Sequence, residues 1–345
     1  MSGGVDSTIA AHVLKSQGHE VVGLHLVLGQ VGGGDRADDS ARDAAQTADA
    51  LGVRFETVDC RGKLERIVDY FCDAYNRGLT PNPCVRCNAE LKFRTLCEFA
   101  DEIGAQLVAT GHYARVVTQG RRRAIARGRD AKKDQSYVLH RLTQPQLERL
   151  TLPVGEMTRA DVEAAARRLG LDAADRPSSQ EVCFAPGGDH TAVLRARCPD
   201  ALVPGPILDT AGQTLGQHPG IQFFTVGQRR GLGIALGAPR YVVRLDPTEH
   251  AVVIGTKDEI EQPEAWVSDV NWMAAVGLDA ARRADVQIRY SHAAAPAELE
   301  PAGPDRVRVR FDEPQPAVTP GQAAVFYEGD VVLGGGWIER RDAPG

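Results

Sequence analysis

The stretch Ser2-Gly3-Gly4-Val5-Asp6-Ser7 stands directly before an amphipathic helical pattern, and it decides the fold class of this chain. Its two glycines allow the backbone to curl into a nest of N–H groups that can bind an anion. Ser7 begins a predicted helix over 7–17, and the positive end of a helix dipole also favours a phosphate. The stretch therefore predicts a phosphate-binding loop that opens a nucleotide-binding domain.

The loop lacks the lysine of the Gly-Lys-Ser/Thr loop found in many nucleoside triphosphatases. It resembles instead the loop of enzymes that split ATP into AMP and pyrophosphate. Asp6 is a candidate to orient a hydroxyl group or to help hold Mg²⁺. The alternative is a helix cap that follows a flexible glycine pair, and the full string with its helix favours phosphate binding over that alternative.

A regular alternation of helices and strands follows the loop. Helices are predicted over 7–17, 37–51, 64–76 and 89–103, and strands over 20–28, 53–58 and 106–110. Such alternation predicts an α/β fold with a parallel sheet that is covered on both faces. The loop is expected to follow a buried strand, yet only Met1 precedes it, so we expect that the first strand is missing and that the true start lies upstream.

The second half of the chain has a different texture. A hairpin is predicted over 115–126 with its turn at Gln119-Gly120, and a helix over 159–169. Glycine and proline then become frequent between short strand-like runs at 223–226, 241–245 and 252–254. Alternating residues such as those of Arg306–Phe311 predict a small antiparallel β-barrel. We therefore expect an ATP-pyrophosphatase (PP-loop) domain over 1–189, a small central linking domain over 190–260 and a barrel-like domain over 261–345.

Charge and cysteine content narrow the class of protein. The net charge of -6 gives no global sign of nucleic-acid binding, so any basic surface must be local. No apolar run approaches the ~18 residues that a membrane span needs, and no secretory signal opens the chain. Seven cysteines, an odd number, do not form the framework of a small secreted protein. We expect a cytoplasmic protein with no membrane segment, in which a conspicuous cysteine is catalytic or binds a metal.

Two cysteines lie in the string Thr80-Pro-Asn-Pro-Cys84-Val-Arg-Cys87-Asn88, at the spacing of redox pairs and metal ligands. Cys87 is predicted at the start of the helix over 89–103, where the helix dipole lowers the pKa of a thiol and raises its thiolate fraction. Arg86 and Lys92 are expected to lower that pKa further. A structural zinc site needs four ligands, and the chain has no second Cys-x-x-Cys pair to supply them.

Cys183 lies in Ser178-Ser-Gln-Glu-Val-Cys183-Phe-Ala-Pro and is the candidate partner of Cys87. Taken alone, Cys183 could equally be a buried small hydrophobic residue. The other four cysteines fall within predicted strands or helices, or at their ends, and are expected to be packing residues: Cys60, Cys72, Cys97 and Cys198.

A basic segment lies between His112 and Lys133. Asp130 is its only acidic residue, against eight basic residues: Arg115, Arg121, Arg122, Arg123, Arg127, Arg129, Lys132 and Lys133. A segment of charge +7 (eight minus one) within a chain of net charge -6 is a candidate surface for nucleic-acid phosphates. The alternative is a solvated hairpin that carries long polar side chains.

Taken together, these residues resemble the bacterial tRNA-specific 2-thiouridylase (MnmA/TrmU) family over essentially the whole chain. The resemblance rests on motifs that occur in order: Ser2-Gly-Gly-Val-Asp-Ser7, Thr80-Pro-Asn-Pro, Cys87-Asn88, Lys92-Phe93, Ala109-Thr-Gly-His-Tyr113, Lys133-Asp-Gln-Ser-Tyr137, Val182-Cys-Phe184, Thr225-Val-Gly-Gln228, Gly231-Leu-Gly-Ile234 and Thr319-Pro-Gly-Gln322. So many ordered matches are not expected by chance.

The resemblance implies a tRNA thiolase, a transferase that adenylates C2 of the wobble uridine (U34) with ATP and Mg²⁺ and then transfers a persulfide sulfur to give 2-thiouridine. Cys87 would be the nucleophile, and Cys183 would carry the persulfide received from a cytoplasmic sulfur-relay protein. ATP would be held by the loop and two further residues: Ser2, Gly3, Gly4, Val5, Asp6, Ser7, Leu26 and Gly111.

The resemblance also implies residues that bind tRNA through its anticodon loop. The target base would be contacted by Asn82 and Pro83, and Cys84 is also among the residues predicted to contact tRNA. Other parts of the tRNA would be contacted by His112, Lys133, Asp134, Gln135, Arg289, Tyr290 and Gln322, with the terminal barrel adding contacts.

Cys84 departs from the common family pattern, in which many members have Asp at this position. Three thiols, at Cys84, Cys87 and Cys183, are enough to hold a [4Fe-4S] cluster with one open iron, as in related thiolases. A plain disulfide relay needs only Cys87 and Cys183. The sequence leaves both open, and with them the role of Cys84 as a cluster ligand, a resolving thiol or a passive replacement.

Two other functions compete with a tRNA thiolase. An ATP pyrophosphatase that acts on a small molecule would share the loop but would leave the cysteines unexplained. A non-catalytic RNA-binding protein with a vestigial ATP loop is the second, and the absence of a strand before the loop supports it.

Overall fold

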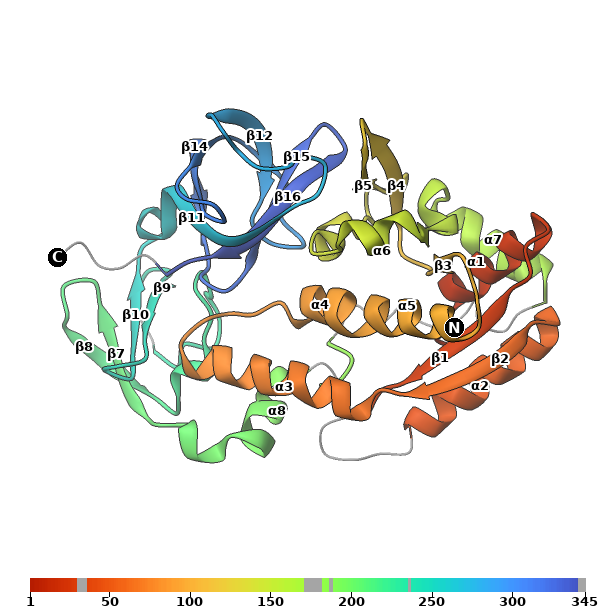
Figure 1. Cartoon of the computed structure of the whole chain (residues 1–345). Coiled ribbons are helices and arrows are strands. Elements are labelled where there is room, and N and C mark those ends of the chain that lie inside the picture. Colours follow the sequence, from red (N-terminus) through yellow and green to blue (C-terminus); the bar gives the residue numbers. More distant parts are fainter. Residues whose placement is uncertain (30–35, 171–181, 186–188, 235–236, 341–345) are drawn as a thin grey trace. The chain divides into compact units, whose positions relative to one another are not determined.

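The computed structural model describes residues 1–29, 36–170, 182–185, 189–234 and 237–340 (Figure 1). The chain divides into two compact units. Unit 1 comprises Met1–Ile67, Cys84–Gly188 and Asp330–Leu333, and unit 2 comprises Val68–Pro83, Asp189–Gly329 and Gly334–Gly345. Unit 1 is α/β with parallel strand pairs and unit 2 is mainly antiparallel β, which confirms the predicted fold class.

Unit 1 is built around two parallel strand pairs. β1 (Val22–Val27) pairs with β2 (Arg54–Asp59), and β3 (Val108–Ala109) pairs with β6 (Leu150–Thr151). The helices around them are α1 (Val5–Ser16), α2 (Arg36–Leu51), the first half of α3 (Arg61–Asn76) and α7 (Arg159–Arg168). In Figure 1, α2 runs along the β1–β2 pair and α1 lies beside α7. The helices and strands predicted for this part of the chain are confirmed, with small shifts of their ends.

Met1 lies against β1, where a strand leading into the loop would run. Its amino group donates a hydrogen bond to the Leu24 carbonyl oxygen, and His25 Nδ1 donates to the Met1 carbonyl oxygen at 2.9 Å. A Cβ on Gly23 would meet the Met1 sulfur at 2.7 Å, so the Met1 side chain is closely packed. Among the described strands, none joins the two parallel pairs into one sheet.

The helix predicted over 89–103 begins earlier, at Pro83. It runs as α4 (Pro83–Arg86), a π-helical turn η1 (Cys87–Lys92) and α5 (Phe93–Glu102). The predicted start is wrong because Pro83 already occupies the first helical position. Proline suits the first helical position, where a missing N–H leaves nothing unpaired. Cys87 therefore lies inside the helix rather than at its N-terminus.

The predicted hairpin is confirmed. β4 (Ala114–Gln119) and β5 (Arg122–Arg127) pair antiparallel, and Gly120 has the positive φ of 58° that such a turn favours. Within unit 1, Val331 at the start of β16 (Val331–Ile338) pairs with Ala126 of β5 and adds a third strand to the hairpin.

A four-stranded sheet forms the first part of unit 2. Its order is β8-β7-β10-β9, with bounds Thr214–His218, Gly205–Asp209, Ala251–Gly255 and Tyr241–Asp246. The strands predicted at 241–245 and 252–254 are confirmed, but the strand predicted at 223–226 is wrong. Ile221–Phe223 form a 3₁₀ turn, and the Thr225 N–H then donates to Gln228 Oε1 at 3.0 Å. Gly227, with φ of 88°, closes this second turn, so residues 223–226 do not form a strand.

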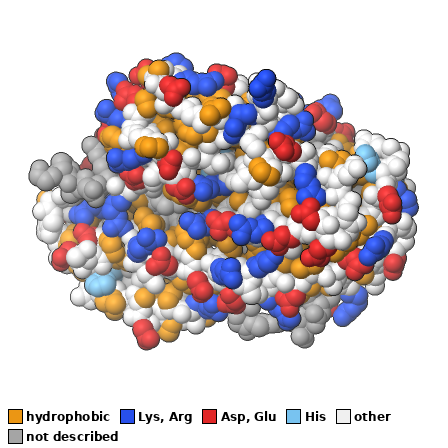
Figure 2. All heavy atoms as spheres, viewed as in Figure 1, with side chains coloured by type: hydrophobic (Ala, Val, Ile, Leu, Met, Phe, Trp, Pro, Cys, Tyr) orange, Lys and Arg blue, Asp and Glu red, His pale blue; other side chains and the backbone are white. Residues whose placement is uncertain are grey.

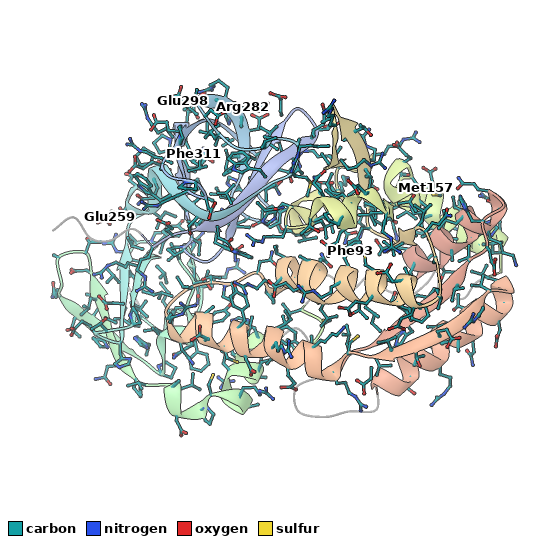
Figure 3. All side chains as sticks on the ribbon, in the orientation of Figure 1. Phe93, Met157, Glu259, Arg282, Glu298 and Phe311 are labelled. Carbon is teal, nitrogen blue, oxygen red and sulfur yellow. The ribbon has the colours of Figure 1, made fainter. Side chains whose placement is uncertain are left out.

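A six-stranded barrel forms the second part of unit 2 and confirms the predicted barrel. The strands follow the order β11-β14-β13-β12-β15-β16, and β11 pairs with β16 to close the ring. Their bounds are Glu261–Trp272, Val307–Pro316, Ala295–Pro301, Arg282–Gln287, Ala323–Glu328 and Val331–Ile338. Phe311 on β14 is buried, whereas Arg282 on β12 and Glu298 on β13 are partly exposed to solvent (Figure 3).

Buried and exposed residues alternate along β14, which explains the alternating sequence pattern from which this strand is predicted. Val307 and Val309 are buried in the barrel, while the intervening Arg308 pairs with Glu264 at 2.6 Å on the other face. Across the described residues, none of the helices combines the length and the apolar character needed to cross a bilayer.

Candidate active site

The loop Ser2–Ser7 is closed by its own serine hydroxyls. The Ser2 N–H donates to Ser7 Oγ at 3.1 Å, and Ser7 Oγ donates to the Gly4 carbonyl oxygen at 3.0 Å. Gly3 has a φ of 76°, and a Cβ on it would meet Asp43 of α2 at 3.3 Å. Because α1 begins at Val5, the first N–H groups of the helix have no carbonyl partner within it. This is the geometry of an anion-binding loop.

Gly111 lies directly against this loop. A Cβ on Gly111 would stand 2.5 Å from the Asp6 carbonyl carbon and 2.6 Å from the Ser7 nitrogen. Only glycine permits such an approach, so residue 111 fixes the position of the loop backbone. Leu26, the other residue predicted near ATP, is half-buried in β1.

Asp6 is oriented by two residues whose roles the sequence did not reveal. Asp6 Oδ1 accepts a hydrogen bond from the Tyr113 hydroxyl and one from Arg159 Nη1, each at 2.8 Å. Arg159 is held in turn by Glu163 at 2.7 Å. Burial, reinforced by the hydrogen bond to Asp6, raises the pKa of Tyr113, which therefore stays a donor. Asp6 Oδ2 accepts no hydrogen bond within the described residues, so the carboxylate can still contribute one oxygen to Mg²⁺.

The three predicted thiols lie in unit 1 and differ in exposure. Cys87 is 5% exposed, Cys84 is partly exposed and Cys183 is exposed, and none of the three forms a disulfide with a described residue. Of the string quoted around Cys183, residues 182–185 are described, and the others lie outside the described residues. Cys87 opens the π-helical turn, a feature that is frequent at functional sites. Asn88 fixes this turn by donating to the Val138 carbonyl oxygen at 3.1 Å.

Burial dominates the chemistry of the two thiols in this helix. It raises the pKa of Cys87 to about 12, although the nearby Lys92 ammonium opposes the rise. Burial likewise raises the pKa of Cys84, again against the effect of Lys92. The predicted low pKa of Cys87 is therefore wrong. The helix begins at Pro83, which places Cys87 away from its positive end, and the cost of burying a thiolate exceeds the benefit of the Lys92 charge.

Lys92 lies within electrostatic range of all three thiols. Burial lowers the pKa of Lys92, but its interactions with Cys87, Cys183 and Cys84 outweigh this and raise the pKa above its ordinary value. The ammonium group is therefore charged at neutral pH. Lys92 thus interacts electrostatically with candidate thiols from two separate stretches of sequence.

A cluster-binding arrangement is not formed. No three His, Cys, Asp or Glu side chains among the described residues are placed to hold a metal ion, and Cys84, Cys87 and Cys183 are all described. The three thiols therefore do not fit a [4Fe-4S] cluster in this structure. A relay between two cysteines requires no such ligand set.

Comparison with known proteins finds matches over nearly the whole chain. Residues 1–187 match the tRNA methyl transferase HUP domain family, residues 191–256 the tRNA methyl transferase PRC-barrel domain and residues 263–338 the aminomethyltransferase beta-barrel domain. The chain is 46% identical to the tRNA-specific 2-thiouridylase MnmA of Syntrophotalea carbinolica, over 98% of this chain and 97% of that protein. It is 45% identical to the tRNA-specific 2-thiouridylase MnmA of Carboxydothermus hydrogenoformans, over 99% of this chain and 96% of that protein.

This chain belongs to the MnmA family. The resemblance noted in the sequence is thereby confirmed, and the ATP-type loop agrees with the HUP domain matched by residues 1–187.

His112 is a partly buried neutral imidazole. Thr110 Oγ1 lies 2.8 Å from His112 Nδ1, and the ring of Phe93 (Figure 3) lies 5.7 Å from the His112 ring, centroid to centroid. Burial, helped by the Lys92 charge, lowers the pKa of His112 to about 3. The ring can therefore exchange hydrogen bonds with RNA at neutral pH but brings no positive charge.

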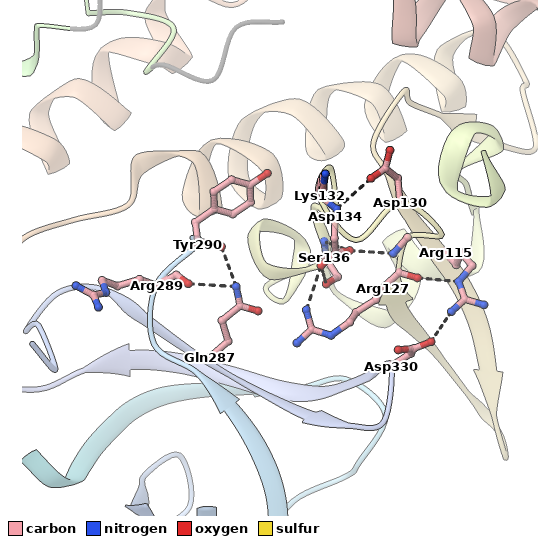
Figure 4. Close-up of polar contacts among 11 residues, drawn as sticks. Arg115, Arg127, Asp130, Lys132, Asp134, Ser136, Gln287, Arg289, Tyr290 and Asp330 are labelled. Atoms are coloured by element: carbon pink, nitrogen blue, oxygen red, sulfur yellow. Dashed lines mark hydrogen bonds and ion pairs between the residues drawn. The ribbon is translucent and has the colours of Figure 1, made fainter. Parts of the chain in front are cut away.

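Asp134 and Gln135 are engaged within the protein (Figure 4). Asp134 Oδ1 accepts from the Gly128 N–H at 2.9 Å, and its Oδ2 accepts from the Ser136 hydroxyl at 2.7 Å. Gln135 Oε1 accepts from the Tyr113 N–H at 3.0 Å. In the MnmA fold of this chain both side chains thus shape the loop that follows β5, and a contact of theirs with tRNA stays a prediction.

Much of the basic segment is also paired internally. Arg115 bonds the Arg127 carbonyl oxygen at 2.7 Å and pairs with Asp330 at 2.9 Å, while Arg127 reaches Asp134 at 3.3 Å (Figure 4). On the face shown in Figure 2, basic and acidic side chains are interspersed. The positive charge that remains for RNA phosphates is therefore smaller than the count of basic residues predicts.

In unit 2, the Thr80–Pro83 segment is clamped by the loop that carries Gln322. Gln322 Nε2 donates to the Thr80 carbonyl oxygen at 2.9 Å, and the Thr80 N–H donates to the Pro320 carbonyl oxygen at 2.9 Å. Gly321, with φ of 88°, allows this contact, since its Cβ would meet the Thr80 nitrogen at 3.0 Å. Gln322 therefore positions the segment that leads into Asn82 and Pro83.

Arg289 and Tyr290 lie together on the barrel of unit 2 (Figure 4). Gln287 Nε2 donates to the carbonyl oxygens of both residues, at 3.1 and 2.9 Å, and so fixes the backbone between them. Tyr290 is 41% exposed, and stacking of its ring on a tRNA base stays a prediction.

Proposed function

We propose that this chain is a tRNA-uridine 2-sulfurtransferase that uses ATP to replace the C2 oxygen of the wobble uridine (U34) with sulfur. The observation that carries the proposal is the joint presence, in one unit of an MnmA-family chain, of an anion-binding loop and three thiols around Lys92. A small-molecule ATP pyrophosphatase has no use for the second feature.

Adenylation comes first, because a carbonyl oxygen is a poor leaving group. The uridine O2 attacks the α-phosphorus of ATP, pyrophosphate leaves, and the O2–AMP ester formed can be expelled later. The loop Ser2–Ser7 binds the phosphates through its N–H groups and the start of α1, and Gly111 fixes the loop. Asp6 would hold Mg²⁺ through its second oxygen, and this ion would neutralise charge on the departing pyrophosphate.

Sulfur transfer follows. A donor protein of the cytoplasm leaves a persulfide on the exposed Cys183. The Cys87 thiolate attacks the Cys183 sulfur, so a Cys87–Cys183 disulfide forms, the outer S–S bond breaks and hydrosulfide is released. Hydrosulfide adds to C2, and AMP leaves with the former O2. A thiol reductant then supplies two electrons and two protons to restore both thiols.

Lys92 would allow these sulfur-transfer steps to proceed at neutral pH. Its ammonium group interacts with Cys87 and Cys183, so it stabilises the negative charge that moves from the Cys87 thiolate to the departing hydrosulfide. Burial without this cation would leave the thiolate uncompensated. Cys84 is not required in this scheme.

The tRNA would be held by the residues that the family resemblance implies. Asn82 and Pro83 would face the target base, with Cys84 beside them in the tRNA-contact set, and an unpaired anticodon uridine needs little unstacking to reach them. The further contacts would come from His112, Lys133, Asp134, Gln135, Arg289, Tyr290 and Gln322.

The proposal is tested by counting iron and sulfide and by assaying thiolation together. The protein is purified without oxygen and then given ATP, Mg²⁺, unmodified tRNA and a persulfide donor. We expect iron-free protein that forms 2-thiouridine, with Cys87→Ala and Cys183→Ala inactive and Cys84→Ala active. Stoichiometric iron and acid-labile sulfide, lost with activity in all three variants, would instead establish a [4Fe-4S] enzyme and refute the relay.

A further inference from the structure

A loop over residues 128–135, called the Asp130 loop, leads from β5 to the 3₁₀ turn η2 (Ser136–Leu139) in unit 1. Asp130 shapes its turn. Asp130 Oδ1 accepts from the Lys132 N–H at 3.0 Å (Figure 4), and the Asp130 carbonyl oxygen accepts from the Lys133 N–H at 3.0 Å. The side chains of Arg129 and Lys132 are exposed. Exposed cations on a fixed turn are suited to bind RNA phosphates.

One link joins this loop to Asp6 through Tyr113. The Gln135 N–H donates to the Tyr113 carbonyl oxygen at 2.8 Å, and Gln135 Oε1 accepts from the Tyr113 N–H at 3.0 Å. At the other end of the loop, a Cβ on Gly128 would stand 2.7 Å from the Tyr113 carbonyl oxygen. The Tyr113 hydroxyl donates in turn to Asp6 Oδ1 at 2.8 Å. The position of this donor is therefore set from both ends of the loop.

A second link joins the loop to Asp6 through Arg159, the first residue of α7. Asp130 Oδ2 accepts from the Arg159 N–H at 2.9 Å, and Arg159 Nη1 donates to Asp6 Oδ1 at 2.8 Å. The hydrogen bond from the Arg159 N–H lowers the pKa of Asp130, so this carboxylate is charged at neutral pH. The two links thus leave the loop at different residues and converge on one oxygen atom.

We infer that Asp130 is a positioning residue of the adenylation site, which joins the Asp130 loop to the Asp6 carboxylate so that tRNA and Mg²⁺·ATP strengthen each other's binding. This coupling rests on the proposed function, because it takes the loop as a tRNA contact and Asp6 as a ligand of Mg²⁺. Asp130 itself is in neither set and acts through Arg159. Its negative charge opposes phosphate binding in an otherwise basic segment, and its hydrogen bonds give it a different use.

The sign of the coupling follows from the shared support of Asp6. Tyr113 and Arg159 fix one oxygen of Asp6, and the other oxygen is the one proposed to bind Mg²⁺. Phosphates bound by Lys132 and Lys133 would order the loop, and the ordered loop holds both donors in place before the nucleotide arrives. Mg²⁺·ATP would in turn fix Asp6 and, through the same hydrogen bonds, the loop. Coupling between two ligands is reciprocal, and factors of about 5 to 150 are typical.

The coupling is measured by binding to the full chain, without turnover. The affinity of fluorescently labelled, unmodified tRNA is determined with and without Mg²⁺ and α,β-methylene-ATP, an analogue whose α–β bridge does not break. We expect the nucleotide to tighten tRNA binding about tenfold in the parent, and tRNA to tighten nucleotide binding by the same factor. In Asp130→Ala the factor should fall to about three, because the Tyr113 link remains and would carry half of the coupling free energy. Asp130→Asn, which keeps an acceptor oxygen, should lie between the two.

Asp161→Ala is the matched control. Asp161 caps the same first turn of α7, but it does so through Thr158, whose N–H donates to Asp161 Oδ2 at 2.8 Å. This variant should lower the thermal midpoint about as much as Asp130→Ala and yet keep the parent coupling factor, so a mere loss of α7 stability is recognised. Asp130→Asn carries the test if Asp130→Ala does not fold.

The outcomes separate this coupling from the proposed function. Parent protein that binds tRNA and the nucleotide analogue independently of one another overturns the coupling and leaves the proposed function standing. An unchanged factor in both Asp130 variants, or an equal loss of coupling in Asp161→Ala, overturns the role of Asp130. Parent protein that binds no tRNA, or no nucleotide analogue, refutes the proposed function and the coupling with it.

Discussion

The phosphate loop and the thiol segment lie in the same unit, but they differ in how ready they are to act. The loop Ser2–Ser7 is closed by its own hydroxyls, supported by Gly111 and fixed through Asp6. In the thiol segment Cys84–Lys92, burial raises the pKa of Cys87 to about 12. The nucleotide site is therefore preorganised, whereas the nucleophile must lose a proton from an unfavourable environment before it acts.

The difference follows from what each group has to do. Backbone N–H groups bind phosphate without any proton transfer, so a rigid loop is enough. A thiol reacts only as the thiolate, which burial disfavours and Lys92 favours. A buried, protonated Cys87 is also protected from oxidants between turnovers, so the same feature that slows the nucleophile preserves it.

The largest expected effect is on the preorganised loop. Gly111→Ala places a Cβ 2.5 Å from the Asp6 carbonyl carbon, so the loop backbone must move. We expect tRNA-dependent pyrophosphate release to fall about 10²-fold or more, since small misplacements of reacting groups have costs of this size. Gly62→Ala, at a position with open space around it, is the control and should be neutral. Pyrophosphate release at the parent rate in Gly111→Ala would show that the loop is not held by this contact.

The next effect concerns the reactivity of Cys87 toward iodoacetamide. With a pKa of about 12 in place of 9.0, its thiolate fraction at pH 8 is about 10³ smaller than that of an ordinary thiol. The higher nucleophilicity of a more basic thiolate offsets part of this, so alkylation should be about 30-fold slower.

The pH dependence of Cys87 alkylation shows whether the pKa of Cys87 is raised or lowered. Because the pKa is raised, the thiolate fraction should still increase about tenfold per pH unit from pH 7 to 10, without a plateau. Alkylation is followed through the peptide Cys87–Lys92, with the exposed Cys183 as an internal reference. A plateau below pH 9 would mean that Cys87 is activated already in the free protein.

A smaller effect is expected when the cation of the thiol segment is removed. Lys92→Gln should lower 2-thiouridine formation at pH 8 about tenfold, which corresponds to one unit in the pKa of the nucleophile. The loss should shrink as the pH rises, and Lys92→Arg should retain most activity because it keeps the charge. Lys63→Gln, which removes a lysine paired with Glu98 in the same unit, serves as the control. Equal losses in the two Gln variants at every pH would argue against an electrostatic role.

The smallest effect concerns the support of Asp6. Tyr113→Phe removes one of its two donors and should cost about 1 kcal/mol in stability, with a rise in the KM for ATP of about fivefold. Sulfur transfer from preformed adenylated tRNA should not change. Tyr241→Phe, on β9 of unit 2, is the matched control, and an unchanged KM in Tyr113→Phe would leave Arg159 as the sole support of Asp6.

Local sequence patterns predicted most of the fold. The apolar spacing of 7–17 and 37–51 and the strand patterns of 20–28 and 53–58 report on structure that neighbouring residues determine, and α1, α2, β1 and β2 appear where expected. The predictions that failed concern residues whose role depends on the structure around them. Pro83 begins a helix instead of preceding it, and Gly227 turns a segment whose composition is typical of a strand.

Some features of the candidate site could likewise be predicted from local sequence, and others could not. The loop could be found because its six residues are contiguous, but Tyr113 and Arg159 reach Asp6 from 107 and 153 residues away. The Cys-x-x-Cys spacing identified the thiols, yet the protonation state of Cys87 depends on burial by the folded chain.

The most direct test of the account is whether the two half-reactions separate in Cys87→Ala. The variant is incubated with α-labelled ATP, Mg²⁺, unmodified tRNA and a persulfide donor, and label on tRNA is measured beside 2-thiouridine. We predict that AMP-labelled tRNA accumulates while no 2-thiouridine forms, because the loop is complete without the thiol. If no label reaches tRNA under conditions in which the parent enzyme thiolates it, the loop does not act independently of Cys87, and the central claim is contradicted.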